Sequence, residues 1–170
     1  MIILGLDPGS LQAGYAVIEL SGRKFNYLHS GALLYKGQGS FLERLPYIYS
    51  SCEKLVADYH PAEIALESLI YVKNPTSLMK LAQARGVMLA AFAKTHAEKI
   101  FEYSPNLVKS SSTGFGHADK EGIQKSMRMI FGIKSFQTFD ESDALAVALC
   151  HALNRGNSKN DRTHSGNRTV

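Results

Sequence analysis

Short apolar runs separated by turn residues organise the first part of the chain. Residues 2–7 form one run that ends at Pro8-Gly9, and residues 14–20 and 24–35 follow with β-favouring side chains on either side of Gly22. Runs of this length, bounded by glycine and proline, are typical of strands. Because the connections between them are short, the pattern predicts an antiparallel meander of three strands.

Helical spacing of apolar residues begins after Ser40, which is a suitable N-cap residue. This pattern predicts a helix to about residue 58, with a kink or a late start at Pro46, because proline lacks a backbone N–H group. The later predicted elements are a strand over 62–67, a helix over 77–97, a strand over 99–103, a short helix from Ser104 through 108, a loop over 110–116, a helix from Asp119 to about 131 and a helix from Asp140 to about 153.

The order of these elements predicts an α/β fold with a mixed five-stranded sheet flanked by helices. A chain of 170 residues is long enough to bury a core without disulfides or a structural metal. We expect one domain over residues 1–154. From residue 155 to residue 170 the chain has no apolar periodicity, so this basic tail is predicted to be disordered.

Two acidic residues stand at the ends of otherwise apolar strands. Asp7 closes the first strand and Glu67 closes the fourth. A charge beside the core costs several kcal/mol unless it is paired or bound to a metal. If these two strands are neighbours, their backbones lie about 4.8 Å apart, and both carboxylates can reach one ion.

A second acidic pair begins the last predicted helix. Asp140 and Asp143 have the i, i+3 spacing that places them on one helix face. Asp140 alone could instead be the N-cap of this helix, but capping does not explain Asp143. Together with the two strand-end acids they form a candidate all-oxygen site that suits Mg²⁺ or Mn²⁺.

Five segments, in this order along the chain, resemble the RuvC family of Holliday-junction resolvases. They are ILGLDPGSLQAGYAVIE, ALESLIYVKNPTSLMKLAQARGV, FEYSPNLVK, GFGHADK and FDESDALAVALCH. The resemblance implies a ribonuclease H-like fold and a homodimer that acts on four-way junction DNA together with the RuvA–RuvB branch-migration complex. It places Asp7, Glu67, Asp140 and Asp143 on the four catalytic acidic positions of the family, and Lys109 and Lys120 on its two basic positions.

One departure from the family concerns the residues that open the junction. Members commonly place a phenylalanine three residues after the catalytic glutamate, whereas this chain has Ile70, followed by Tyr71. Isoleucine offers apolar surface but no π-face for stacking on a base. Either Tyr71 replaces the phenylalanine or the junction is opened differently. Lys73 and Asn74 are expected to contact the DNA backbone.

The residues and the resemblance together predict two-metal hydrolysis of a phosphodiester. Two Mg²⁺ ions about 3.5–4 Å apart would activate water and stabilise the leaving oxygen, giving 5′-phosphate and 3′-hydroxyl ends. Asp7 would bridge the ions, Glu67 and Asp143 would each hold one side, and Asp140 would complete the ligand set. Lys120 or Lys109 would offset the charge that develops on the phosphate.

The net charge of +4 supports this prediction once it is divided along the chain. Residues 70–139 carry ten basic and four acidic residues, whereas residues 140–154 carry three acidic residues and no lysine or arginine. A basic frame around an acidic pocket suits a metal-dependent enzyme that acts on a polyanion. Charge alone favours the simpler interpretation that these residues form solvated helix faces.

Other residues are expected to be structural. Cys52 and Cys150 are interpreted as reduced core thiols of a cytoplasmic protein, and no apolar run is long enough to span a membrane. His117 is expected in a solvated loop and His151 as a packing residue whose charge favours a helix end. The methionines at 79, 88, 127 and 129 are predicted to fill the core.

Three other functions remain open from the sequence. The segment from Asp7 to Tyr15 also resembles the first phosphate loop of actin-like ATPases and sugar kinases, although no second loop is apparent. A non-catalytic protein that binds DNA junctions is another possibility, and the four acids argue against it. The third is a ribonuclease H that cleaves the RNA strand of an RNA–DNA hybrid.

Overall fold

The predicted meander and the mixed sheet are both present. The computed structural model describes residues 1–69 and 74–155, so Ile70, Tyr71, Lys73 and the tail from residue 156 lie outside the described residues. The strands are β1 (Ile2–Asp7), β2 (Gln12–Ser21), β3 (Lys24–Leu34), β4 (Glu63–Glu67) and β5 (Ile100–Tyr103). Their order in the sheet is β3-β2-β1-β4-β5. Strand β1 is therefore central, antiparallel to β2 and parallel to β4.

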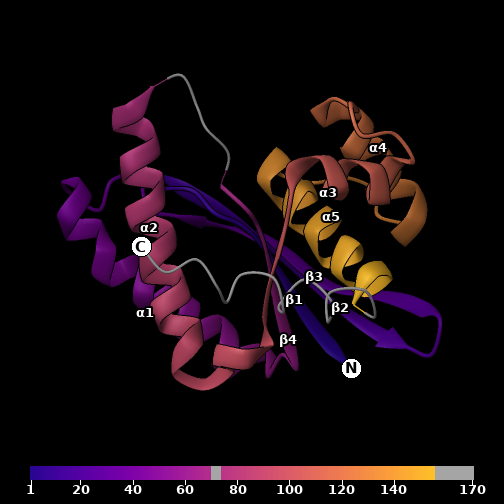
Figure 1. The fold of residues 1–170 in the computed structure, drawn as a ribbon, viewed down its shortest axis with the longest axis horizontal. Helices are drawn as coiled ribbons and strands as arrows, with labels where there is room; N and C mark the ends of the chain where they lie inside the picture. Colours follow the sequence, from indigo (N-terminus) through magenta and orange to yellow (C-terminus); the bar gives the residue numbers. More distant parts are fainter. Residues whose placement is uncertain (70–73, 156–170) are drawn as a thin grey trace, which may run out of the picture.

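Within the described residues, five helices cover the two faces of this sheet. They are α1 (Phe41–Tyr59), α2 (Pro75–His96), α3 (Pro105–Thr113), α4 (Lys120–Phe131) and α5 (Phe139–Asn154), and a short 3₁₀ turn over Ala97–Lys99 precedes β5. Helices α1 and α2 lie on one face, whereas α5 crosses the other face with α3 and α4 beside it (Figure 1). No described helix combines the length and the apolar character needed to cross a bilayer.

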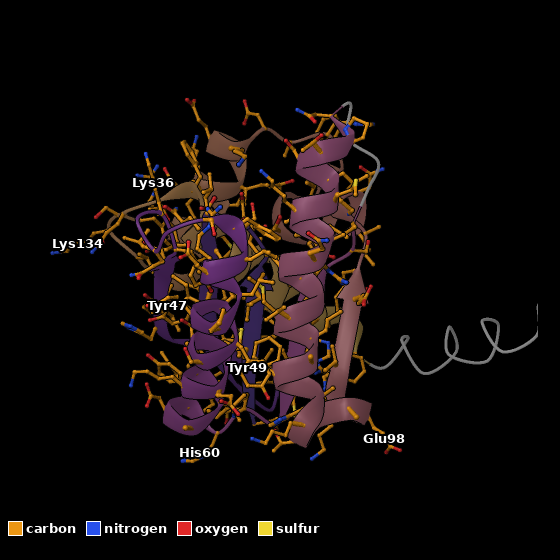
Figure 2. All side chains as sticks on the ribbon, turned by 90° about the vertical axis from the view of Figure 1, so that its left-hand side faces the viewer. Lys36, Tyr47, Tyr49, His60, Glu98 and Lys134 are labelled. Atoms are coloured by element: carbon orange, nitrogen blue, oxygen red, sulfur yellow. The ribbon has the colours of Figure 1, made fainter. Side chains whose placement is uncertain are left out.

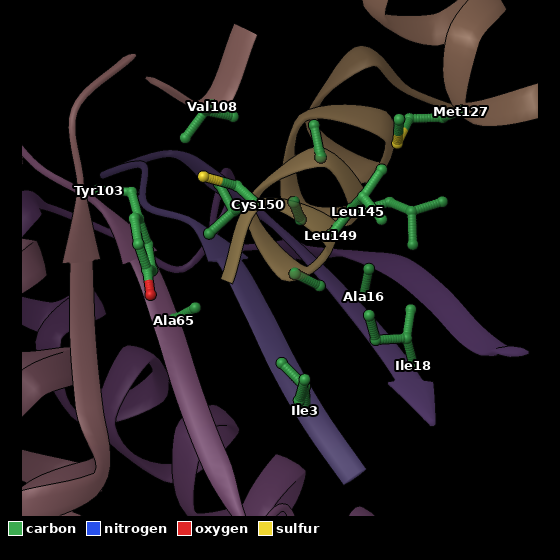
Figure 3. Close-up of a cluster of buried hydrophobic side chains, with 14 of the residues drawn as sticks. Ile3, Ala16, Ile18, Ala65, Tyr103, Val108, Met127, Leu145, Leu149 and Cys150 are labelled. Carbon is green, nitrogen blue, oxygen red and sulfur yellow. The ribbon is translucent and has the colours of Figure 1, made fainter. Parts of the chain in front are cut away.

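Alternation along the strands divides the core into two layers. On the α5 side, Ile3, Ala16 and Ala65 of the sheet pack with Leu145 and Leu149 of α5 (Figure 3). On the opposite side, the sheet packs against α1 and α2, which run side by side in Figure 2. Both expected core thiols, Cys52 and Cys150, are buried and unpaired with each other. Side chains alternate between the two faces of a strand, so Asp7 lies on the same face as Ile3, and Glu67 lies on the same face as Ala65. Both acids therefore face α5.

The starts or ends of two helices differ from the sequence prediction. Helix α1 begins at Phe41 and contains Pro46 within its second turn, so the expected late start is wrong. Helix α3 continues to Thr113 instead of ending near residue 108. Its serine- and threonine-rich end was predicted as a loop, but the Ser112 and Thr113 hydroxyls donate to backbone carbonyl groups one turn earlier and support the helix. Gly114, with φ of +76°, then ends it.

His151 does not act as a cation at the end of α5. Its side chain is fully buried, Nε2 lies 2.7 Å from Glu63 Oε2, and Nδ1 lies 2.7 Å from the Tyr103 hydroxyl. The pKa of His151 is lowered, chiefly by burial, although the Glu63 carboxylate acts to raise it. A neutral ring that donates to Glu63 and accepts from Tyr103 satisfies both contacts. His151 therefore fastens α5 to β4 and β5.

The methionine prediction is correct for only two of the four side chains. Met88 and Met127 are fully buried, whereas the side chains of Met79 and Met129 are largely exposed. His117 is exposed in the loop between α3 and α4, as expected, and its ring meets the edge of Phe115.

Candidate active site

The sheet brings the two strand-end acids together. Parallel pairing matches Leu6 of β1 with Leu66 of β4, so Asp7 and Glu67 are the next residues along two adjacent strands. Both side chains face α5 and line the same cleft, which has a volume of about 260 Å³. The predicted neighbourhood of strands one and four is confirmed.

Two glycines allow α5 to approach this edge of the sheet. A Cβ atom on Gly5 would lie 2.7 Å from the backbone nitrogen of Ala148, and one on Gly14 would overlap the backbone carbonyl group of Asp140. Any side chain at either position would therefore hold the helix away from β1 and β2. Because Gly14 pairs with Asp7 across the sheet, this close approach sets the first turn of α5 beside Asp7.

The N-terminal end of α5 supplies the other two acids, Asp140 and Asp143. Asp140 is not the N-cap of the helix, since the Thr138 hydroxyl accepts the capping hydrogen bond from the backbone N–H of Glu141. Oxygen atoms of Asp7, Asp140 and Asp143 all lie within 4.8 Å of one another. Glu67 does not belong to this tight group but reaches the cleft from the side of β4. The structure thus brings all four predicted acids to one place.

Side chains from three elements hold this acidic turn. The Lys120 ammonium group, at the start of α4, lies 3.5 Å from Asp143. Gln12 at the start of β2 donates its amide N–H to Asp140, and Ser30 of β3 donates to the buried Glu141. Neither Gln12 nor Ser30 was singled out from the sequence, because each meets a partner more than a hundred residues away.

Burial and mutual repulsion make the charged forms of these carboxyl groups costly. Burial is the largest cause of the rise in the pKa of Asp7 to about 8, and the charges of the other three acids add to it, while Lys120 opposes it. The pKa values of Glu67 and Asp143 are also raised, again chiefly by burial. A bound cation would offset this cost by neutralising the charges.

The donor set fits a hard divalent cation. Among the described residues, the buried Oδ1 atom of Asp143 has no hydrogen-bond partner, although its Oδ2 atom faces Lys120. A buried carboxylate oxygen without a donor is rare in proteins and suits a position that a metal ion would fill. Clustered carboxylates without sulfur or histidine ligands are typical of Mg²⁺ and Mn²⁺ sites.

The predicted basic residues divide into two groups. Lys109 of α3 and Lys120 of α4 both line the acidic cleft, together with Pro105, Val108 and Ile123. Asn74 lies outside this group, and its side chain caps α2 by accepting from the backbone N–H of Ser77. This contact engages Asn74 Oδ1 and not the Nδ2 group that would donate to a phosphate, so the expected DNA contact of Asn74 stays a prediction. The positions expected to open the junction, Ile70 and Tyr71, and the neighbouring Lys73, lie outside the described residues.

The raised pKa of Asp7 predicts how stability depends on pH without metal. Asp7 ionises near its ordinary pKa of 3.8 in the unfolded chain but near 8 in the folded one. Its contribution to the free energy of unfolding therefore falls as pH rises from about 4 to about 8. We expect Asp7→Asn to flatten this decline and to stabilise the metal-free protein at pH 8 by about 2 kcal/mol or more, since one pKa unit corresponds to about 1.4 kcal/mol.

Urea unfolding in EDTA at several pH values measures this effect. Addition of Mg²⁺ at pH 8 should restore stability to the unmodified chain more than to Asp7→Asn. An unchanged pH dependence in Asp7→Asn would contradict the assignment of the decline to Asp7.

Comparison with known proteins identifies the family. The family model described as crossover junction endodeoxyribonuclease RuvC matches residues 3–151. Proteins of that name from Natranaerobius thermophilus and Idiomarina loihiensis are 40% and 41% identical to this chain, and each alignment covers 89% of it. The alignments cover 94% and 86% of those two relatives.

Solved structures agree with the sequence comparison. The structure of T. thermophilus RuvC in complex with Holliday junction substrate superposes with a TM-score of 0.83 at 28% identity, covering 93% of this chain and 96% of that one. The yeast mitochondrial Holliday junction resolvase Ydc2, at 14% identity and a TM-score of 0.66, shares the fold. The fold is the expected ribonuclease H-like one, and the chain belongs to the RuvC family of crossover junction endodeoxyribonucleases.

Proposed function

We propose that this protein is an endonuclease that resolves Holliday junctions by paired, symmetric nicks during homologous recombination and DNA repair. The observation that carries the proposal is the cluster of Asp7, Asp140 and Asp143 in a cleft that Lys109 and Lys120 also line, in a chain of the RuvC family. Clustered carboxylates for a cation beside two ammonium groups suit hydrolysis of a phosphodiester.

Mg²⁺ is the proposed cofactor, two ions per active site, with Mn²⁺ as a substitute. Asp7, Glu67, Asp140 and Asp143 would hold the ions. When bound, they would supply a nucleophilic water and charge stabilisation for hydrolysis to 5′-phosphate and 3′-hydroxyl ends. The raised pKa values of Asp7, Glu67 and Asp143 support this assignment, because a cation favours the ionised carboxylates that repel one another in its absence.

The two lysines orient the DNA strand over the acids. Lys120 remains 64% exposed although it contacts Asp143, so its ammonium group is accessible to a phosphate at the mouth of the cleft. Lys109 approaches the same cleft from α3. In this arrangement the lysines bind the phosphate and stabilise the charge that develops on it, while the acids lie beneath.

A homodimer is the proposed active assembly. A four-way junction is nearly two-fold symmetric, so a two-fold dimer places identical sites on equivalent strands. Helix α2 buries one side, including Met88 and Phe92, and leaves residues such as Met79 exposed, which is compatible with a share in the dimer interface. We further propose action in the cytoplasm with the RuvA–RuvB complex, and nuclease activity within residues 1–154.

A nicking assay tests the function directly. The full chain is incubated with a synthetic four-way junction in Mg²⁺, with linear duplex and an RNA–DNA hybrid as parallel substrates. We expect symmetric nicks, ligatable ends and loss of activity in EDTA, with little cleavage of the other two substrates. Binding of the junction without cleavage in Mg²⁺ or Mn²⁺ would favour a non-catalytic role, and preferential cleavage of the hybrid would favour a ribonuclease H.

Lys120 provides a further prediction. Replacing it by methionine keeps the aliphatic stem but removes the charge near Asp143 and the phosphate, so we expect the single-turnover cleavage rate to fall by about 10²–10³-fold. Junction affinity should change far less, because one phosphate contact among many is lost. The control is Lys125→Met, an exposed lysine on the same helix. Equal rates for the two variants would refute a role for Lys120 in the chemical step.

A further inference from the structure

Gln12 is an uncharged side chain that contacts the acidic cluster. It opens β2, and its Nε2 group donates to Asp140 Oδ2 at 2.5 Å, across 128 positions of sequence. The contact is partly buried, which shields it from competing water. No other hydrogen bond or ion pair to the Asp140 side chain is found among residues 1–69 and 74–155.

The backbone makes this contact a consequence of the fold. Gln12 and Gly14 are two residues apart on one strand, so both face α5. At Gly14 the backbone of Asp140 lies where a Cβ atom would stand. The close packing of β2 against the first turn of α5 therefore brings the Gln12 side chain within reach of the Asp140 carboxylate.

The charge of the donor matters for a metal ligand. Asp143 faces the Lys120 ammonium group, which opposes the rise that burial causes in the pKa of Asp143 and competes with a cation for the same carboxylate. Asp140 instead faces a neutral amide, which orients the carboxylate without neutralising it. With Oδ2 engaged by Gln12, the Oδ1 atom of Asp140 has no hydrogen-bond donor among the described residues and is the oxygen more open to a metal ion.

Other contacts hold the helix turn itself. The Thr138 hydroxyl caps α5, and Ser30 of β3 binds the buried Glu141 carboxylate at 3.3 Å. Removal of the Gln12 amide would thus release the side chain of Asp140 and leave the turn in place. Substitution of Gln12 can therefore change the orientation of the Asp140 carboxylate without unfolding the first turn of α5.

We propose that Gln12 is a positioning residue that holds the Asp140 carboxylate in its metal-binding orientation and thereby raises the affinity of the site for divalent cations. The inference rests on the proposed metal site. Partners that orient metal ligands typically change metal affinity by 10–100-fold when they are removed. We expect a rise of about 10-fold in the dissociation constant for the more weakly bound ion.

Mn²⁺ binding to the full chain tests the proposal without DNA or catalysis. Free Mn²⁺ is measured by electron paramagnetic resonance for the unmodified protein, for Gln12→Met and for Asn26→Leu. Asn26→Leu is a matched control, because Asn26 of β3 also donates a hydrogen bond from its side-chain amide to a carboxylate, that of Glu19 on β2. This pair is not part of the acidic cluster of the active site. Gln12→Met should bind Mn²⁺ about 10-fold more weakly, and Asn26→Leu should bind it like the unmodified chain.

Two further measurements separate positioning from damage to the fold. The Mg²⁺ concentration that gives half-maximal cleavage should rise in Gln12→Met, while the rate at saturating Mg²⁺ stays within about threefold of the original, because excess cation restores occupancy. The midpoint of urea unfolding in EDTA should change little. In an Asp140→Ala background, Gln12→Met should have no additional effect on Mn²⁺ binding.

The outcomes distinguish this proposal from the function on which it rests. If the unmodified chain binds no Mn²⁺, the proposed metal site is wrong. If it binds Mn²⁺ and Gln12→Met binds equally well, the positioning role of Gln12 is wrong and the metal site stands. Weaker binding that persists in the Asp140→Ala background, or that is matched by Asn26→Leu, would also overturn the role of Gln12.

Discussion

Asp7→Asn should abolish junction cleavage while leaving junction binding nearly intact. Asp7 lies at the centre of the cluster, since its oxygen atoms share a 4.8 Å group with Asp140 and Asp143 and it lies next to Glu67 across the sheet. Asparagine has the same shape but removes one negative charge and one ligand oxygen. We expect the cleavage rate to fall by at least about 10³-fold, which corresponds to about 4 kcal/mol of activation free energy.

Single-turnover nicking of a four-way junction in Mg²⁺ measures this loss, and gel-shift titration in Ca²⁺ measures binding. Asp58→Asn is the matched control, because Asp58 forms an exposed ion pair with Lys54 on α1. That variant should cleave at the original rate. Cleavage by Asp7→Asn within tenfold of the unmodified protein would rule out Asp7 as a metal ligand.

The same substitution should stabilise the metal-free fold. In the absence of a cation, burial makes ionised Asp7 unfavourable, so the side chain that we expect cleavage to require lowers the free energy of unfolding at pH 8. A variant that is more stable and yet inactive would show that the acids are held together for binding a cation. A variant that is inactive because it is unfolded would instead have a lower free energy of unfolding in urea than the unmodified chain.

The strand-end acids could be predicted because their signal is local. A short apolar strand that ends in a carboxylate is unusual, and Asp7 and Glu67 both show this pattern. The short connections and the turn residues also predicted the strands. N-cap residues such as Ser104 and Asp119 predicted where helices begin. The resemblance to a family then ordered these local features into one site.

The remaining features depend on contacts between distant segments. Gly14 gives no sign in the sequence that the backbone of Asp140 lies against it, and Gln12 resembles any polar residue at the start of a strand. His151 was correctly predicted to be a packing residue, but its neutral state was missed for a similar reason, because that state follows from burial against Glu63 and Tyr103. Periodicity also failed for Met129, since an apolar side chain on a helix can face solvent.

Gly14→Ala should impair both stability and cleavage although it adds only one methyl group. The new Cβ atom would overlap the backbone carbonyl group of Asp140. Because this group belongs to the backbone of a helix, it cannot move aside as the end of a flexible side chain could. To remove this overlap, the N-terminal end of α5 must shift away from β2, which moves Asp140 and Asp143 away from Asp7. Overpacking of this kind costs about 1–3 kcal/mol. A displacement of about 1 Å at reacting groups lowers rates by about 100-fold.

Gly86→Ala is the matched control for stability. Gly86 lies inside α2 with no atom near the place of a Cβ, so alanine there should raise the free energy of unfolding by about 0.5–1 kcal/mol through its helix propensity. Urea unfolding and Mn²⁺ titration of both variants therefore compare the same chemical change at a packed and at an open glycine. If Gly14→Ala matched Gly86→Ala in stability and kept the original Mn²⁺ affinity, close contact between β2 and α5 would not be what assembles the acidic cluster.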